Sequence, residues 1–424
     1  MLPNGEEEYI LYNCASNKIM LFINDIRSII DDNIKEPSGI KKIHPDLYDY
    51  LCENNFIVPK SYDEVEESVA NRKKKMEDSS YFNLTINPTL NCNLRCWYCY
   101  ETHIPGSHVA VSTMNAIKKL LKSKAESEKV KHIGLNFFGG EPLLEFKSTI
   151  MPLIEYTDEI CKANDKPLHI GFTTNGVLLT PRVSDILSAT GIQMRMQIPF
   201  DGDSEKHNAV KKFVNGKGTY RLIISNIKYA VKKKIHCIIR CNYSLDNVDS
   251  FHSLIDELKD FALENTNLLT FSFHQIWQTT SGKEPSLGGI IAKMEQLGLK
   301  HNYKPTIDAS GSMCYADKKG AVVINCNGDV YKCTARDFIP ERRDGVLNDD
   351  GTVVYNERYK DRMKSPFANP TCIKCSVFPI CSTCTQKRME HSTNKTCVVN
   401  KNETHRMDMI TTRIRLLAQQ APES

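Results

Sequence analysis

Three cysteines stand close together in the segment NCNLRCWYCY, residues 91–100, at the spacing Cys92-x3-Cys96-x2-Cys99. Thiolates are the usual ligands of a four-iron cluster, which takes four of them. This segment supplies three and has no obvious fourth beside it, so one iron would keep an open position. A metal with an open position binds substrate or cofactor, whereas a fully ligated one is structural. The spacing therefore predicts a catalytic iron–sulfur centre, and it differs from the paired knuckles of common zinc sites.

This loop resembles the cluster loop of radical S-adenosylmethionine (SAM) enzymes, which have an aromatic residue where Tyr98 precedes the last cysteine. The resemblance implies that the three thiolates hold a 4Fe–4S cluster, that the amino and carboxylate groups of SAM bind its open iron, and that Tyr98 packs near the adenine. It also implies that an electron from the cluster cleaves SAM, and that the resulting 5′-deoxyadenosyl radical takes a hydrogen atom from the substrate. Three buried cysteines at a chance spacing are the alternative.

A double glycine follows a second expected strand, in the sequence FFGGEP of residues 137–142. Glycine lets the backbone approach a ligand because it carries no Cβ, so its carbonyls are accessible to an ammonium group. The GGE motif of the family binds the SAM amino group at this place, which implies that role for Gly139, Gly140 and Glu141. The alternative is a tight turn into a helix that begins at Pro142.

Polar residues at three further strand ends complete the expected SAM site, namely Thr173, Asn175, Gln197, Arg240 and Asn242. The first two offer a hydroxyl and an amide to the ribose, although Asn-Gly is also an ordinary turn. Gln197 opens the segment QIPFDG, in which Pro199 takes a place that the family often fills with serine or threonine. Arg240 and Asn242 resemble positions that bind the SAM carboxylate and ribose, with a surface salt bridge as the alternative.

The carboxyl third of the chain holds a second group of cysteines, Cys314, Cys326, Cys333, Cys372, Cys375, Cys381, Cys384 and Cys397. In a reducing compartment such clusters point to metal and not to disulfides. A zinc ribbon needs its knuckles roughly fifteen to twenty residues apart, and here five residues separate Cys375 from Cys381. The Asn327-Gly328 pair predicts a hairpin, which we expect to bring Cys326 and Cys333 together.

These cysteines resemble the SPASM extension of radical SAM enzymes, which carries two auxiliary 4Fe–4S clusters and brings the expected total to three. The resemblance implies one auxiliary cluster held by Cys372, Cys375, Cys381 and Cys397. The other would be held by Cys314, Cys333 and Cys384, with Cys326 or the substrate in the fourth place. Two residues separate Cys381 from Cys384 where the family usually has three.

Alternating strands and helices must position these residues. We expect strands at residues 82–88, 132–138, 168–174, 192–200, 236–243 and 269–276, and helices at 112–126, 146–163, 181–188, 219–234 and 248–263. Such alternation predicts an α/β fold with a parallel sheet, and six repeats resemble the partial (β/α)6 TIM-like barrel of the family. In barrels of parallel strands the active site lies at the carboxyl ends of the strands, where the cysteine loop and the glycines stand.

The amino-terminal residues predict a small α+β unit. Short strands are expected at 7–12, 18–24 and 56–58, and helices at 25–32, 44–54 and 61–76. The unit resembles the leader-peptide-binding element of peptide-maturing radical enzymes, with a simple cap on the barrel as the alternative. The expected domains are thus this unit at 1–78, the barrel at 79–300, the SPASM domain at 301–400, and a C-terminal helix and tail at 401–424.

Composition narrows the class of protein. The 424 residues are 41% apolar, as in ordinary globular proteins, and no run approaches the roughly eighteen apolar residues of a membrane helix. An acidic start without an apolar run shows no secretory signal, so we expect a cytoplasmic protein. The net charge of +4 gives no case for nucleic acid. Five isolated cysteines are expected in the core: Cys14, Cys52, Cys161, Cys237 and Cys241.

The leading hypothesis is a radical SAM/SPASM enzyme that modifies a ribosomally made peptide, for example by a thioether or carbon–carbon crosslink. Its partners would be the precursor peptide and a reductant protein such as flavodoxin or ferredoxin. An anaerobic sulfatase maturase that forms formylglycine is one alternative; it is expected to use an acid just after the second SPASM cysteine, where Thr334 stands with Asp337 nearby. A non-catalytic iron–sulfur carrier or zinc-stabilised binding protein is the other. Asp201, His207 and His274 each have ordinary structural explanations, so no catalytic acid or base is identified.

Overall fold

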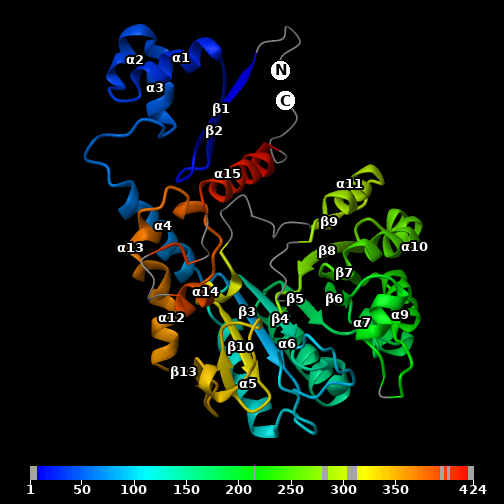
Figure 1. The fold of residues 1–424 in the computed structure, drawn as a ribbon. Helices are drawn as coiled ribbons and strands as arrows, with labels where there is room; N and C mark the ends of the chain where they lie inside the picture. Colours follow the sequence, from blue (N-terminus) through cyan, green and yellow to red (C-terminus); the bar gives the residue numbers. More distant parts are fainter. Residues whose placement is uncertain are drawn as a thin grey trace. The chain divides into compact units, whose positions relative to one another are not determined.

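The computed structural model describes residues 7–213, 215–278, 285–302, 313–391, 396–398 and 402–418 (Figure 1). The chain divides into two compact units. Unit 1 comprises Met1–Glu77, Ile307–Cys314 and Arg362–Ser424, and unit 2 comprises Asp78–Thr306 and Tyr315–Asp361. Residues 315–361, expected within a separate C-terminal domain, therefore group with the barrel strands.

Unit 2 contains the six parallel strands expected from the sequence, in sequential order within one sheet. Each lies within two residues of its expected position: β3 (Tyr81–Asn87), β4 (His132–Phe137), β5 (Leu168–Thr173), β6 (Met194–Phe200), β7 (His236–Tyr243) and β8 (Leu269–Gln275). The α/β prediction and the parallel sheet are thereby confirmed. A short strand, β9 (His301–Asn302), adds a further parallel pairing beside β8.

The predicted hairpin at Asn327-Gly328 is also confirmed, and it extends the same sheet. Strand β10 (Ala321–Asn325) runs parallel to β3 and antiparallel to β11 (Asp329–Tyr331). Gly328 takes the positive φ of 84° that the turn needs. Strands β12 (Gly345–Leu347) and β13 (Val353–Tyr355) continue the antiparallel part. The sequence did not indicate that this hairpin would join the barrel strands.

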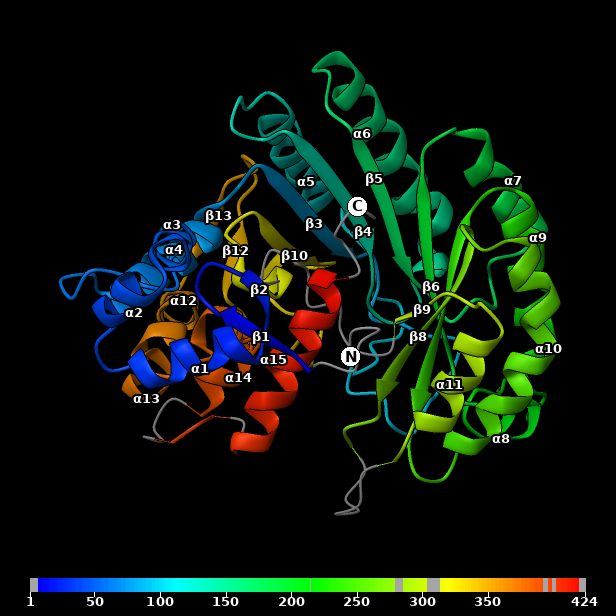
Figure 2. The same cartoon turned by 90° about the horizontal axis from the view of Figure 1, so that it is seen from above.

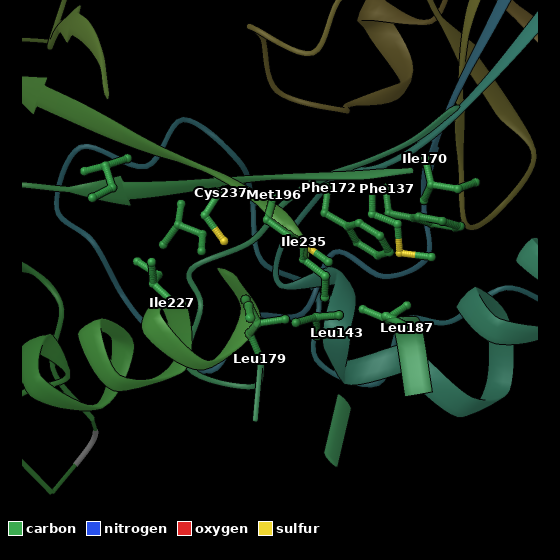
Figure 3. Close-up of a cluster of buried hydrophobic side chains, with 14 of the residues drawn as sticks. Phe137, Leu143, Ile170, Phe172, Leu179, Leu187, Met196, Ile227, Ile235 and Cys237 are labelled. Atoms are coloured by element: carbon green, nitrogen blue, oxygen red, sulfur yellow. The ribbon is translucent and has the colours of Figure 1, made fainter. Parts of the chain in front are cut away.

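Alternation along the parallel strands separates an apolar face from a polar one. On β3, Phe82, Leu84 and Ile86 are buried in the main hydrophobic core, whereas Asn83 and Thr85 line a cavity. The apolar face packs against α5 (Val111–Ala125), α6 (Met151–Ala163), α7 (Pro181–Ala189), α9 (Tyr220–Lys232) and α10 (Phe251–Glu264), which lie outside the strands in Figure 2. Figure 3 shows this packing, with Phe137, Phe172 and Met196 from the strands facing Leu143, Leu179 and Leu187.

Further helices of unit 2 were not expected. Helix α8 (Ser204–Val210) follows β6 and is capped by the Asp203 carboxylate, which accepts from Lys206 N–H. Helix α11 (Gly288–Gln296) precedes β9. Each is nine residues or fewer, too short for a clear periodic pattern in the sequence.

Unit 1 combines the amino-terminal elements with the carboxyl-terminal helices. The expected strands and helices are found as β1 (Glu8–Asn13), β2 (Lys18–Ile23), α1 (Asn24–Asn33), α3 (Pro45–Glu53) and α4 (Glu64–Glu77), with α2 (Ser38–Ile43) in addition. The carboxyl-terminal part contributes α13 (Pro370–Ile373), α14 (Thr385–Glu390) and α15 (Glu403–Ala418), and α12 (Glu357–Ala368) begins in unit 2.

The strand predicted at residues 56–58 is wrong. The N–H groups of Phe56 and Ile57 both donate to the Leu51 carbonyl at the end of α3, so they close a turn and have no strand partner. Their side chains pack on the small core formed by Ile40, Leu47 and Leu51. Among the described helices, none is both long and apolar enough to cross a membrane.

Candidate functional site

A cavity of about 180 Å³ lies where the parallel strands of unit 2 end. The loop after β3 lines it with all three sulfurs of the expected cluster motif, those of Cys92, Cys96 and Cys99. Seven of the nine residues predicted to contact SAM line the same cavity, from three strand ends and the loop: Tyr98, Gly139, Gly140, Thr173, Asn175, Arg240 and Asn242. The structure thus brings together most of the site that the sequence suggested.

Two predicted contacts lie elsewhere. The Glu141 side chain is fully buried, and its carboxylate accepts from the Thr174 hydroxyl (2.7 Å), Asn175 N–H (2.8 Å) and Leu143 N–H (3.0 Å). Its carboxylate therefore ties the end of β4 to the end of β5. Gln197 lines the neighbouring cavity beneath, on the polar face of the sheet.

The three cysteines have the chemistry of a metal site. Burial, with nearby Glu141 and the other two sulfurs, raises the pKa of Cys92 to about 12, and burial raises the pKa of Cys99 to about 11. A bound cation reverses this preference because it stabilises thiolates, so the donor set fits a thiolate-held cluster. In the described parts of the chain no three Cys, His, Asp or Glu side chains already converge as metal ligands. The ligand roles therefore stay predictions.

The double glycine fits closely under the cysteine loop. Gly139 and Gly140 have φ values of 78° and 51°, in the region that side chains disfavour. The Gly140 N–H donates to Glu101 Oε2 at 2.7 Å, and the Glu141 N–H donates to the Asn91 carbonyl at 2.8 Å. These bonds fix the turn after β4 against the residues that flank the cysteines.

We expect Gly140→Ala to lower stability more than Gly106→Ala. Both glycines have positive φ, so both variants pay about 1–2 kcal/mol of backbone strain. Only at Gly140 would the new Cβ lie 2.1 Å from a backbone oxygen, that of Asn91, whereas nothing lies within 4 Å at Gly106. Thermal unfolding under anaerobic conditions should show the larger loss of Tm for Gly140→Ala. Equal losses would contradict the close fit.

Tyr98, between the second and third cysteines, is held by a buried polar network. Its hydroxyl donates to Asp201 Oδ1 (2.6 Å) and accepts from Lys211 Nζ (2.7 Å) and Asn242 Nδ2 (3.1 Å). Lys211 and Asp201 also form a direct ion pair, with side chains that are 2% and 1% exposed. Burial raises the pKa of Tyr98, so the phenol stays neutral. Burial alone lowers the pKa of Lys211, but Asp201 and Tyr98 reverse this and raise it.

Several residues of this cavity were missed from the sequence. Glu101, Lys211, Trp277 and Gln278 all line it, and Gln278 Nε2 donates to the Tyr98 carbonyl at 2.7 Å. Burial raises the pKa of Glu101 to about 7. The position of Glu101 two residues after Cys99 was a usable signal. The pairing of Lys211 with Asp201 was not, because it depends on the unexpected helix α8.

The carboxyl-terminal cysteines of unit 1 form a second group. Cys372, Cys375, Cys381 and Cys397, the expected ligands of one auxiliary cluster, line one small cavity with Arg388. Arg388 Nη2 lies 3.4 Å from the sulfur of Cys381. Burial alone raises the pKa of Cys381, but Arg388 and the Thr383 hydroxyl outweigh it, so the pKa is lowered. A cationic partner for a thiolate is what a cluster ligand needs.

Cys14 joins this second group, although the sequence suggested only a core residue. It packs with Cys375 and Cys381 around Val377 and Ile380, and burial, with Cys375 nearby, raises its pKa. Of the other four isolated cysteines, which we expected in the core, three are buried and one is half-buried. Cys161, Cys237 and Cys241 are buried, and Cys52 is half-buried.

The hairpin does not bring Cys326 and Cys333 together, so that prediction is wrong. In the antiparallel register Val323 faces Tyr331 and Ile324 faces Val330. Cys326 therefore lies at the turn, packed in the hydrophobic core, while Cys333 follows the opposite end of the hairpin. The hairpin therefore gives no support for Cys326 as a fourth ligand beside Cys333. The remaining expected ligands, Cys314 and Cys384, belong to unit 1, and Cys333 belongs to unit 2.

Comparisons with known proteins show which proteins the chain is similar to. Residues 86–258 match the model of the Radical SAM superfamily. The chain is 22% identical over 376 residues to the radical SAM cyclopropyl synthase TigE of Paramaledivibacter caminithermalis, covering 80% of this chain and 75% of TigE. It is 24% identical over 318 residues to the mycofactocin maturase MftC of Mycolicibacterium smegmatis, covering 70% and 76%.

A solved structure shares the fold. The structure of native anSMEcpe with bound AdoMet and Kp18Cys peptide superposes with a TM-score of 0.59 at 18% identity, covering 80% of this chain and 99% of that one. At this identity the likeness concerns the fold alone. It agrees with the α/β fold and the parallel sheet described above.

Proposed function

We propose that the chain, whose residues 86–258 match the Radical SAM superfamily model, is an enzyme of that superfamily that binds SAM and a 4Fe–4S cluster at the cysteine loop and modifies a ribosomally synthesised peptide. The single observation that carries the site is the shared cavity of Cys92, Cys96 and Cys99 with the double glycine. When bound, the cluster and SAM supply a 5′-deoxyadenosyl radical that abstracts hydrogen from the substrate. The match to the Radical SAM superfamily model, together with relatives named as a synthase and a maturase, favours an enzyme over the non-catalytic alternative.

The residues of this chain would bind SAM and orient it in the cavity. We expect the carbonyls at Gly139 and Gly140 to accept from the SAM ammonium, and Asn175 and Asn242 to bond its ribose; the support is that all four residues line the cavity beside the cysteines. Tyr98 is fixed by Asp201, Lys211 and Asn242, so its ring has one orientation. Trp277, which follows β8, lines the cavity with its ring tilted against that of Tyr100, with ring centroids 5.9 Å apart.

A peptide substrate is supported by the relatives. One is named a maturase, and the solved structure of similar fold holds a peptide together with AdoMet. The four cysteines and Arg388 in unit 1 support one auxiliary 4Fe–4S cluster. We propose a second auxiliary cluster on Cys314, Cys333 and Cys384 from the family pattern alone. A crosslink, as a thioether or a carbon–carbon bond, is the modification that we propose.

The formylglycine alternative is weakened by the environment of Asp337. Its Oδ1 accepts from the Thr102 and Phe338 N–H groups at 2.8 and 2.9 Å, and its Oδ2 accepts from the Thr102 hydroxyl at 2.6 Å. These three donors hold the carboxylate against Thr102 and Phe338, so both of its oxygens already have partners within the loop. Asp337 is also absent from the described lining of the cysteine cavity.

The test is an anaerobic reaction of the reconstituted full chain with SAM, dithionite and synthetic peptides from short reading frames beside its gene. We expect 5′-deoxyadenosine together with a peptide that has lost two hydrogen atoms, seen by mass spectrometry. A sulfatase-motif peptide serves as the comparison. An aldehyde on that peptide, with no change in the others, would favour the maturase alternative. Release of no nucleoside would contradict the proposed function.

A further inference from the structure

A second and a third cavity continue from the cysteine cavity along the polar face of the parallel strands. The second, of about 260 Å³, shares Phe138 and Thr173 with the cysteine cavity. The third, of about 480 Å³, shares Asn136, Gly171 and Arg195 with the second. The shared lining residues make the three cavities neighbours along this face. We call the second and third together the lumen.

Glycines on the polar face make room for amide side chains that line the lumen. A Cβ on Gly171 would lie 2.2 Å from Asn136 Oδ1, and one on Gly134 would lie 2.7 Å from both Asn83 Oδ1 and the Tyr81 hydroxyl. Asn136 Nδ2 donates to Asn83 Oδ1 at 2.7 Å across these glycines. The absence of a side chain at Gly134 and Gly171 therefore lets the two amides pack against the strands and bond to each other.

The charges of the lumen have one sign. Among its described lining residues none is Asp or Glu, whereas Arg195 and Lys234 are cationic and His169 and His236 add imidazoles. Burial, Arg195 and Lys300 lower the pKa of His236, so this imidazole is neutral near pH 7. Tyr81 stacks on His169, and burial raises its pKa, so the phenol is neutral too. Nothing in the described lining neutralises the cations.

Arg195 is the cation at the junction of the two cavities. Its guanidinium makes no hydrogen bond or ion pair with the described residues, and Arg195 is an exposed residue that lines both cavities. Arg240 differs, because its Nε donates to Asn242 Oδ1 at 3.0 Å. A guanidinium presents a planar fork of donors that matches a carboxylate. An unpaired one inside a lumen lined by amides therefore points to an anionic ligand group.

We propose that Arg195 binds a carboxylate of the peptide substrate inside the lumen, next to the residue that is modified. This inference rests on the proposed function. The carboxylate is either an Asp or Glu side chain or the C-terminus of the peptide. A substrate in which that position is neutral binds more weakly.

The register of the strands sets the distance between Arg195 and the cysteine cavity. Arg195 pairs with Gly171, and Gln197 pairs with Thr173 at the wall shared with the cysteine cavity. Arg195 thus lies two strand positions below Thr173, a distance of about 7 Å. An extended peptide covers that distance in roughly two residues. We therefore expect the carboxylate within two or three residues of the modified one.

The test measures peptide retention on the immobilised, reconstituted full chain with SAM and without reductant. The probes are four pools of otherwise random decapeptides, with Glu or Gln at one fixed position and a free or amidated C-terminus. We expect the wild-type chain to retain an acidic pool about tenfold more than the neutral, amidated pool, as a charge-assisted hydrogen bond implies. Preference for Glu in amidated peptides identifies a side chain, and preference for a free terminus in Gln peptides identifies the C-terminus.

Variants assign the preference to one residue. Arg195→Gln should reduce the ratio to about one, Arg195→Lys should keep part of it, and Arg182→Gln, an exposed arginine on α7, should leave it unchanged. Circular dichroism and iron content check that Arg195→Gln is folded. If it is not folded, the retention ratio of Arg195→Lys is used in its place, and a ratio equal to that of the wild type then overturns the inference. Equal retention of all pools by the wild type, or an unchanged ratio in Arg195→Gln, overturns the inference. Nucleoside release from SAM by the wild type is measured separately, and its absence contradicts the proposed function instead.

Discussion

Lys211→Met should destabilise the chain by about 3–5 kcal/mol, because it leaves the carboxylate of Asp201 buried without its cation. Both side chains are almost fully buried and in direct contact. Methionine fills a similar volume, so the loss of charge dominates the effect. Without Lys211 the Tyr98 hydroxyl keeps two of its three partners, and we expect the apparent KM for SAM to rise. Thermal unfolding and SAM titration under anaerobic conditions measure the two effects.

The control for this prediction is the double variant Lys211→Met with Asp201→Asn. It removes both charges, and replacing a whole buried ion pair often costs little. The double variant should therefore recover most of the stability that the single variant loses. A single variant as stable as the wild type, or a double variant no better than the single, would contradict the account of this network.

Replacing Cys92, Cys96 and Cys99 together with alanine should remove about four irons per chain, the content of one cluster. The iron held through the cysteines of unit 1 should remain. The matched variant replaces Cys372, Cys375, Cys381 and Cys397, which line their own cavity. It should lose a separate set of irons and keep those of the cysteine loop. Iron and sulfide counts on anaerobically reconstituted protein distinguish the two sets, and a complete loss of iron in both variants would contradict independent sites.

The strands of the barrel could be predicted from sequence because each carries a strong local pattern. The run of residues 236–243 matches β7 at both ends, since buried residues alternate with partly buried ones along it. The failures concern non-local contacts. Phe56 and Ile57 have the composition of a strand, but their N–H groups close the end of α3. The pairing of β10 with β3 joins residues more than 230 positions apart, which no local pattern encodes.

The candidate site was predictable where its residues stand in short motifs. The cysteine loop and the double glycine each occupy a few consecutive residues, and the structure places them in one cavity. The sequence could not show that the Glu141 carboxylate bonds to Thr174 and Asn175, because these contacts join the ends of two different strands. Cys326 was misjudged because the length of the hairpin, not its turn, decides where Cys333 lies.

The most direct test of the central claim is the release of 5′-deoxyadenosine from SAM. The full chain, reconstituted anaerobically and reduced with dithionite, should release the nucleoside. The variant with alanine at Cys92, Cys96 and Cys99 should release none while it keeps the iron of unit 1. Nucleoside release by that variant at the wild-type rate would contradict the assignment of the cysteine loop as the reaction centre.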